Sequence, residues 1–224
     1  MSRKTTLTIL LILAVPQILA AQRIVSAEEF FSDLSTTFGT IKDYMATVTF
    51  TQGKGVSRGR LYYKSPLFLR IDFDAPPRQV INFDGEKLTV YDPSNNVTLE
   101  QAYKKKTPSQ LDQLLGARGL SILQRNYSVA YLVGPDPVPL EEGSKDMVVK
   151  LRLTSRGTTG YSEMIISVKD GFYRRIEATP INGDKWVWDF TNVKMNQGIP
   201  DSRFNYDSPP DANVISDWLF DSEQ

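Results

Sequence analysis

Near the start of the chain, apolar residues recur at the intervals of a helix. Ser26 is followed three residues later by Glu29, which is the spacing of a capping box at a helix N-terminus. Phe30, Leu34 and Phe38 then follow on one helical face. This pattern predicts a single amphipathic helix whose apolar face must be buried against the rest of the fold.

From Tyr44 the period changes to two, which is typical of a β-strand with one buried face. A second strand is expected after a loop from Gly53 to Gly59, and a third ends before Pro76. The Asp84-Gly85 pair is a strong turn signal between a fourth and a fifth strand. A sixth strand, at about residues 97–103, completes a predicted antiparallel meander.

Between Pro108 and Asn126 the apolar residues return to helical spacing on either side of Gly116 and Gly119, which predicts two short helices. Further alternating segments follow, and a last short strand is expected to contain Phe204. These later strands are expected at about residues 129–133, 149–153, 164–168, 172–181 and 186–193.

Each predicted strand has one apolar and one polar face, as in an antiparallel sheet covered on one side. The predicted fold is therefore mainly β (α+β): an antiparallel sheet bent into a half-barrel, with the two amphipathic helical segments as candidates to cover its inner face. Alternation alone does not distinguish a packed core from a lined apolar cavity, so both interpretations stay open at this point.

The first residues have the pattern of an export signal. Arg3 and Lys4 precede an apolar run that ends at Pro16 and is too short to span a bilayer as a helix. We expect cleavage near Ala21, which gives a signal peptide at 1–21 and a single domain at 22–224. We therefore expect a periplasmic protein. The chain has no cysteine, so neither a thioether lipid anchor nor a disulfide framework is available.

Histidine is absent as well as cysteine. Together these absences remove the usual general base, the thiolate nucleophile and the main borderline metal ligands. Loss of Arg3 and Lys4 from 26 basic and 26 acidic residues leaves 24 against 26, a balance unlike that of nucleic-acid-binding proteins. We expect no enzyme activity, no cofactor and no metal. The carboxylates that keep a glycan hydrolase open as an alternative are Asp72, Asp74, Asp84, Glu86, Asp92 and Glu100.

Several short motifs, in a fixed order, resemble the periplasmic outer-membrane lipoprotein carrier family (LolA type). Their order and spacing carry the resemblance over nearly the whole mature chain. They are F-T-Q at Phe50 to Gln52, G-x-L at Gly59 and Leu61, Pro66, a D-G-x-x-L-x-x-Y-x-P run from Asp84 to Pro93 after Val80 or Ile81, and the closing segment Phe204 to Ile215.

The resemblance implies an unclosed antiparallel β-barrel with a helical lid that encloses an apolar cavity. This cavity would carry the acyl chains of lipidated proteins from an inner-membrane ABC transporter toward an outer-membrane acceptor. We expect the carrier to be a monomer that binds no nucleic acid. The residues then expected to line the cavity are Ala46, Val48, Phe50, Leu61, Tyr63, Leu69, Ile71, Phe73, Ile81, Met164, Ile166, Val168 and Trp188. The expected lid residues are Phe31, Leu34, Phe38, Leu111, Leu114, Leu115 and Leu123.

One position departs from the family pattern. Well-known members have an arginine directly before the proline matched by Pro66, and this arginine helps to hold the lid, whereas Ser65 stands here. A hydroxyl cannot replace the five donors of a guanidinium group. Arg60 or Arg70 is the alternative latch. The competing interpretation of the same scaffold is a periplasmic sensor that binds lipid or a partner protein without transporting it.

Overall fold

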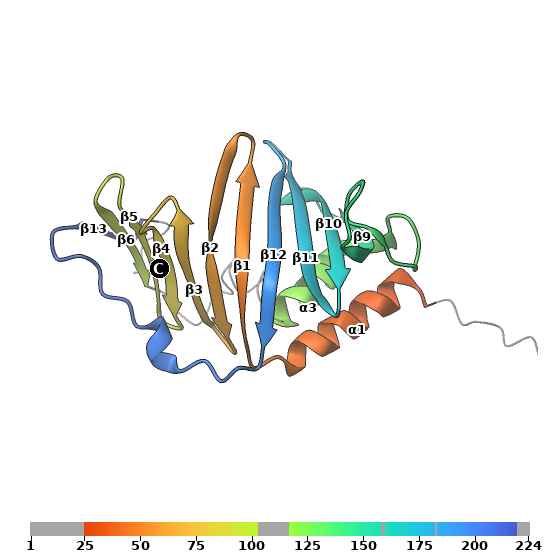
Figure 1. Cartoon of the computed structure of the whole chain (residues 1–224), viewed down its shortest axis with the longest axis horizontal. Coiled ribbons are helices and arrows are strands. Elements are labelled where there is room, and N and C mark those ends of the chain that lie inside the picture. The colour runs from red at the N-terminus through yellow and green to blue at the C-terminus, as the bar shows by residue number, and fades with distance from the viewer. Residues whose placement is uncertain (1–24, 103–116, 158–159, 182, 219–224) are drawn as a thin grey trace, which may run out of the picture.

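The computed structural model describes residues 25–102, 117–157, 160–181 and 183–218 (Figure 1). The order of strands in the sheet is β13-β6-β5-β4-β3-β2-β1-β12-β11-β10-β9-β7, and β8 pairs with β9. The strands are β1 (Asp43–Gln52), β2 (Gly55–Lys64), β3 (Phe68–Ala75), β4 (Val80–Asp84), β5 (Lys87–Asp92), β6 (Val97–Ala102), β7 (Tyr127–Tyr131), β8 (Val138–Pro139), β9 (Met147–Ser155), β10 (Tyr161–Lys169), β11 (Phe172–Pro180), β12 (Trp186–Met195) and β13 (Asn213–Ser216).

The sheet is open, because β13 and β7 form its two ends and do not pair with each other. All neighbouring strands on this path are antiparallel except β13, which runs parallel to β6. The six-stranded meander occurs as predicted, and it joins the later strands through the pairing of β1 with β12. The predicted fold class, mainly β with an unclosed antiparallel sheet, is confirmed.

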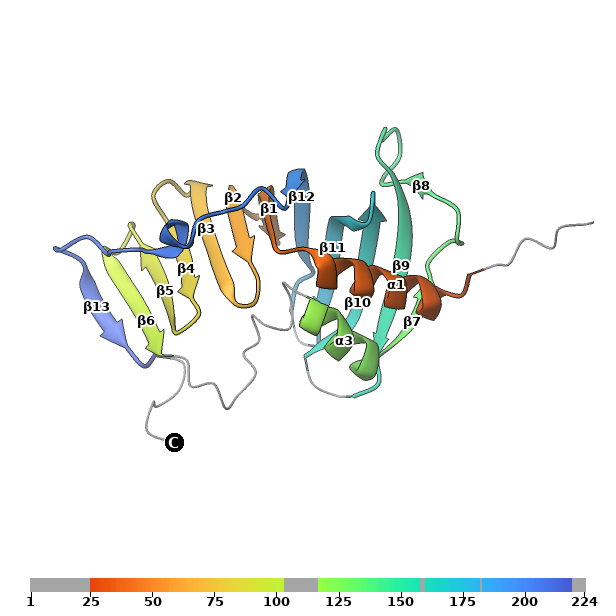
Figure 2. The ribbon, with the colours of Figure 1, turned by 90° about the horizontal axis from the view of Figure 1, so that it is seen from below.

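Two described α-helices, α1 (Ala27–Thr40) and α3 (Ala117–Asn126), contact each other and β7. Both lie on one face of the half of the sheet that contains β7 to β11 (Figure 2). The side-chain oxygen of Ser26 accepts a hydrogen bond from the backbone N–H of Glu29 at 3.1 Å, so the predicted cap is confirmed. The first of the two helices expected between Pro108 and Asn126 lies outside the described residues, as does the expected signal peptide.

The predicted loop from Gly53 to Gly59 is wrong, because β2 already begins at Gly55. Gly59 lies within β2 opposite Phe73 of β3, with a register shift just before it. A Cβ atom on Gly59 would lie 2.5 Å from the carbonyl oxygen of Asp72, closer than any side chain allows. The glycine therefore marks a close approach of two backbones inside the sheet rather than a flexible loop.

The expected last strand at Phe204 is also wrong, because Phe204 ends a short 3-10 helix, η1 (Asp201–Phe204). Phe204 is fully buried against the sheet at the point where this segment crosses it. We call residues 196–212, which link β12 to β13, the strap. The strap crosses the face of β2 to β4 opposite to that covered by α1 (Figure 2), so the apolar spacing of this segment reflects packing rather than strand pairing.

The strap is anchored mainly by polar contacts. The carboxylate of Asp43 accepts the backbone N–H groups of Gln197 and Gly198 at 2.7 and 3.0 Å. The side-chain amide of Asn82 donates to the carbonyl oxygen of Phe204 at 2.8 Å. Arg203 lies 4.0 Å from the ring centroid of Tyr62. These contacts fix the path of the strap before it reaches the sheet edge.

We expect Gly59→Ala to lower the free energy of unfolding by about 1–3 kcal/mol, because the added methyl group meets backbone atoms that cannot rotate away. Urea denaturation followed by tryptophan fluorescence measures this change. Gly134→Ala is the matched control, since a Cβ atom there meets nothing within 4 Å. Equal stability of the two variants would contradict the close approach.

Candidate functional site

The strand register places the expected cavity residues on one face of the sheet. Ala46 lies opposite Leu61, Leu61 opposite Ile71, and Ile71 opposite Ile81, so one row of side chains crosses four strands. On the other half, Ile166 joins the same face through β11 and β12. We call this face the inner face; it is the one on which α1 and α3 lie.

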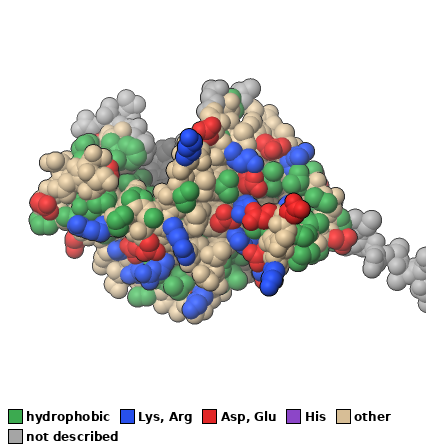
Figure 3. Space-filling model, turned by 45° about the horizontal axis from the view of Figure 1, so that its top comes forward, with side chains coloured by type: hydrophobic (Ala, Val, Ile, Leu, Met, Phe, Trp, Pro, Cys, Tyr) green, Lys and Arg blue, Asp and Glu red, His purple; other side chains and the backbone are tan. Residues whose placement is uncertain are grey.

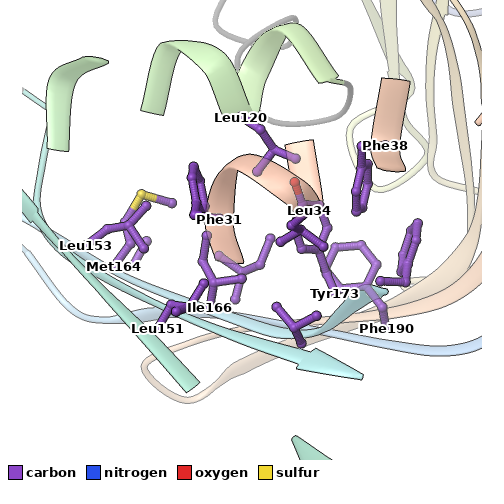
Figure 4. Close-up of a cluster of buried hydrophobic side chains, with 14 of the residues drawn as sticks. Phe31, Leu34, Phe38, Leu120, Leu151, Leu153, Met164, Ile166, Tyr173 and Phe190 are labelled. Atoms are coloured by element: carbon purple, nitrogen blue, oxygen red, sulfur yellow. The ribbon is translucent and has the colours of Figure 1, made fainter. Parts of the chain in front are cut away.

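One half of the inner face is filled by helix packing. Phe31 and Leu34 of α1 point toward Leu151 and Ile166 of the sheet, and Leu120 of α3 packs against the same group (Figure 4). Phe31, Leu151 and Ile166 are each at most 1% exposed. Phe38 stacks on Phe172 and Tyr173 with ring centroids 5.0 and 4.4 Å away. We call this region, from β7 to β12 under the two helices, the closed half.

Two tyrosines are completely enclosed where the closed half meets β1. Burial, and then the neighbouring hydroxyl group of Tyr63, raises the pKa of Tyr44 far above its ordinary value. Burial, and then Tyr44, raises the pKa of Tyr173 in the same direction. Both phenols are therefore neutral in the folded protein, and ionising either would require opening the apolar interior.

The inner face of β3 to β6 is only partly covered. No helix among the described residues lies over it (Figure 2), in contrast to the closed half. Its apolar side chains are half-buried, while Leu69 and Phe83 at one end of the same strands are buried. We call this region the open half; its half-buried side chains are Ile71, Phe73, Ile81, Leu88, Val90, Val97 and Leu99.

Four half-buried aromatic side chains lie together at one end of the central strands. The ring centroid of Phe50 lies 5.1 Å from that of Trp188 and 5.9 Å from that of Trp186. Tyr161 lies 5.9 Å from Trp186, and the hydroxyl group of Tyr127 donates to the carbonyl oxygen of Tyr161. This aromatic group extends the inner face toward solvent between the two halves.

The expected cavity residues divide between the two halves and the central strands that join them. Eight of them are buried: Ala46, Val48, Leu61, Tyr63, Leu69, Met164, Ile166 and Val168. Five are half-buried: Phe50, Ile71, Phe73, Ile81 and Trp188. The structure brings all thirteen to one face, and their role in holding cargo stays a prediction.

The expected lid residues are only partly described. Phe31, Leu34 and Phe38 are buried under α1, and Leu123 of α3 is half-buried against the same core. Leu111, Leu114 and Leu115 lie outside the described residues. Leu120 was not among the expected lid residues, although it is the most buried residue described in α3; its helical spacing with Leu123 was the available signal.

A pocket of about 600 Å³ lies on the flank of α1, beside β9 and the turn between β10 and β11. Its apolar lining includes Phe30, Leu34 and Val168. Sequence reasoning missed this pocket, because strand alternation does not show that Val149 of β9 faces the same space. The lining also contains acidic and basic side chains, so the pocket is less apolar than the open half.

The outer face of the sheet is charged and internally paired. Arg174 donates to Asp146 and Asp189 at 2.7 and 2.8 Å, and Arg175 donates to Asp189 at 2.8 Å. Lys169, and then Arg174, lowers the pKa of the Asp146 carboxyl below its usual range. Figure 3 shows acidic and basic side chains side by side on the visible surface. The two faces of the sheet thus differ sharply in polarity.

The candidate catalytic acids have local structural partners. Asp72 pairs with Arg203 of the strap, and Glu100 pairs with Lys87 across β5 and β6. Asp84 accepts the backbone N–H groups of its own turn at 2.8 and 2.9 Å. Hydrogen bonds from the Asn95 side chain and the Ser94 backbone lower the pKa of Asp92. Glu86 and Asp74 are exposed.

The expected latch role of Arg70 is not supported by its contacts. Its guanidinium group donates to Asp72 and to the carbonyl oxygens of Arg203 and Asn205, all on the outer face. Strand alternation explains this result, because Arg70 points away from its neighbours Leu69 and Ile71. Arg60 is exposed and also alternates to the outer face, so neither arginine reaches α1 within the described residues.

Within the described residues, no three acidic side chains come together in a way that could hold a metal ion. None of the helices described there is long and apolar enough to cross a bilayer.

Comparison with known proteins gives a consistent result. The family model described as outer membrane lipoprotein carrier protein LolA matches residues 46–207. An outer-membrane lipoprotein carrier protein of Pseudomonas putida is 28% identical over 162 residues, covering 71% of this chain and 72% of that protein. A second, from Pseudomonas entomophila, is 28% identical over 165 residues and covers 72% of each.

Solved structures show the same fold at low sequence identity. An uncharacterised conserved protein of Thermus thermophilus has a TM-score of 0.54 and 14% identity, covering 84% of this chain and 98% of that one. The Pseudomonas aeruginosa MucA/MucB complex contains a chain with a TM-score of 0.51 and 12% identity. That match covers 81% of this chain and 61% of the other.

An open sheet with one apolar, partly uncovered face is the architecture of a binding protein for apolar ligands. The chain belongs to the LolA family of outer-membrane lipoprotein carrier proteins. Its members are carriers and not enzymes, in agreement with the structural roles of the acidic residues described above.

We expect stability to fall as the pH rises above about 10, the ordinary pKa of tyrosine. Burial raises the folded-state pKa of Tyr44 and Tyr173 above the unfolded value, so the unfolded chain loses their protons first and is favoured at high pH. Phenolate absorbance and far-UV circular dichroism, measured together against pH, check this prediction. Complete tyrosine ionisation without loss of circular dichroism would contradict the enclosure of these two side chains.

Proposed function

We propose that this protein is a periplasmic carrier that binds the acyl chains of lipoproteins on the inner face of its sheet and moves them from the inner toward the outer membrane. The observation that carries the proposal is the open half: a row of half-buried aliphatic and aromatic side chains in a member of a lipoprotein carrier family. An acyl chain on this surface would cover the apolar side chains of the open half, as α1 and α3 cover those of the closed half.

The energetics favour a carrier that depends on partner proteins. Each buried CH₂ group contributes about 0.8 kcal/mol, so a carrier holding acyl chains releases them too slowly into water. Release then requires a second apolar site to receive the chains. An inner-membrane ABC transporter for loading and an outer-membrane acceptor for delivery are the partners we propose, together with export of the chain by the N-terminal signal.

The two halves of the inner face suggest an order of binding. Ile71, Phe73 and Ile81 are half-buried and can contact an acyl chain without any movement of α1. Met164 and Ile166 are 1% exposed under α1, so they can meet it only if that helix moves. We therefore propose that cargo first occupies the open half, and that additional chains displace α1 from the closed half.

The second candidate function is binding of a partner protein without transport. Its support is the similarity of fold to MucB, which has been solved in complex with MucA. At a sequence identity of 12%, this similarity is one of fold alone. The open half favours the carrier, because a face of half-buried apolar side chains with no described helix over it can accept acyl chains directly.

Native mass spectrometry of the protein purified from the periplasm tests the proposal. A carrier is expected to retain lipoprotein or lipid, and to release newly made lipoproteins from spheroplasts. Protein that is free of lipid and inactive in release, but that captures one stable polypeptide partner, would favour the sensor instead.

We expect Ile71→Glu to weaken binding of a fluorescent fatty acid by at least about tenfold while the protein remains folded, because the charge faces the acyl chain. Ile71 is preferable to Leu69, which is only 3% exposed, so that a glutamate at Leu69 would unfold the chain. Fluorescence titration measures the change.

Thr47→Glu is the matched control, because Thr47 lies on the outer face of β1 opposite Arg60 of β2. It should leave the affinity unchanged. If Ile71→Glu folds and binds the fatty acid as tightly as this control, the assignment of the open half is wrong.

A further inference from the structure

Strand β13 occupies one edge of the sheet but buries very little of itself. All four of its side chains are exposed, and Val214 and Ile215 keep 55% and 48% of their surface accessible. It runs parallel to β6, and parallel pairing is slightly less stable per residue than antiparallel pairing. Backbone hydrogen bonds to β6 hold β13 itself, and side-chain hydrogen bonds from Asn96 to Asp211 and from Gln101 to Asp217 hold the residues that flank it.

The strap stays anchored without β13. Phe204 is fully buried, the amide of Asn82 donates to its carbonyl oxygen, and Arg70 donates to the carbonyl oxygen of Asn205 at 3.0 Å. Pro209 and Pro210 separate these anchors from β13. Loss of the β13 pairing would therefore leave both the strap and the core intact.

The edge at β6 borders the open half. Leu99 of β6 lies opposite Val90, and Val90 lies opposite Ile81, all on the inner face. An acyl chain on the open half is thus one or two strands from this edge. The opposite edge, β7, contacts both helices of the closed half.

We propose that the extended polypeptide segment next to the acyl group of a cargo lipoprotein displaces β13 and pairs with the edge of β6. This inference rests on the proposed carrier function. A chain attached to acyl groups on the open half must leave the inner face across a rim, and β6 is the rim next to the open half, with a strand at its edge that can be exchanged. Pairing through the backbone depends little on side chains, which suits a carrier of proteins that differ in sequence.

A reversible disulfide between β6 and β13 tests this displacement. Glu100 and Ser216 are register partners, and neither lies on the inner face. The chain has no cysteine, so Glu100→Cys with Ser216→Cys creates one lockable pair. The ligands are a synthetic lipopeptide with a short extended segment, the same lipopeptide with N-methylated backbone amides, and a free fatty acid.

The reduced double variant should bind the lipopeptide about tenfold more tightly than its N-methylated form, because several backbone hydrogen bonds are available only to the former. The oxidised variant should bind both lipopeptides equally, with the weaker affinity. Its affinity for the free fatty acid should not change. Ile215→Pro, which removes a backbone donor from the middle of β13, should strengthen lipopeptide binding and leave fatty-acid binding unchanged.

Equal lipopeptide affinity in the reduced, oxidised and Ile215→Pro proteins would overturn the strand displacement. If those proteins still bind the free fatty acid, the proposed carrier function survives that result. If neither the fatty acid nor the lipopeptide binds, both the carrier function and the strand displacement fail.

Discussion

The packing of α1 against β9 to β11 determines which part of the inner face is closed. An antiparallel sheet with an apolar face must be covered, and Phe31, Leu34 and Phe38 supply that cover over one half. A helix of 14 residues is about 21 Å long, too short to span a sheet of this width. The other half keeps its row of half-buried apolar side chains, and the proposed site for acyl chains depends on this asymmetry.

The opposite face of the sheet is covered by contacts within the protein itself. The strap covers β2 to β4 with hydrogen bonds, ion pairs and the ring of Phe204, and a network of arginines and carboxylates covers β9 to β12. Neither set of contacts draws β13 and β7 together. Among the described residues, the outer face of these strands is occupied mainly by its own polar contacts, and the continuous row of half-buried apolar side chains lies on the inner face.

Sequence patterns predicted the fold well where periodicity is strong. The capped helix and the six-stranded meander followed from spacing alone. The inward direction of Ala46, Leu61 and Ile71 was expected from the resemblance to the carrier family. The secondary structure predicted for two segments was wrong, and each error has a physical reason. Gly59 suggested a loop, although it permits a close backbone approach within β2, and Phe204 suggested a strand, although it packs from a helical turn.

The distinction between filled and open interior could not be predicted from the sequence. Ile166 and Ile71 occupy equivalent alternating positions, yet α1 covers one and not the other. The hydrogen-bond partners of the Arg70 side chain lie in the strap, which is more than 130 residues away in sequence. Long-range packing of this kind leaves no local signature.

Paramagnetic relaxation by a fatty acid that carries a nitroxide on its chain is the most direct test of the division into two halves. With one equivalent bound, the methyl signals of Ile71, Ile81, Val90 and Leu99 should broaden. The signals of Leu151, Leu153 and Ile166 should remain sharp. Broadening confined to the latter group, or spread evenly over both groups, would contradict the assignment of the open half as the primary acyl-chain site.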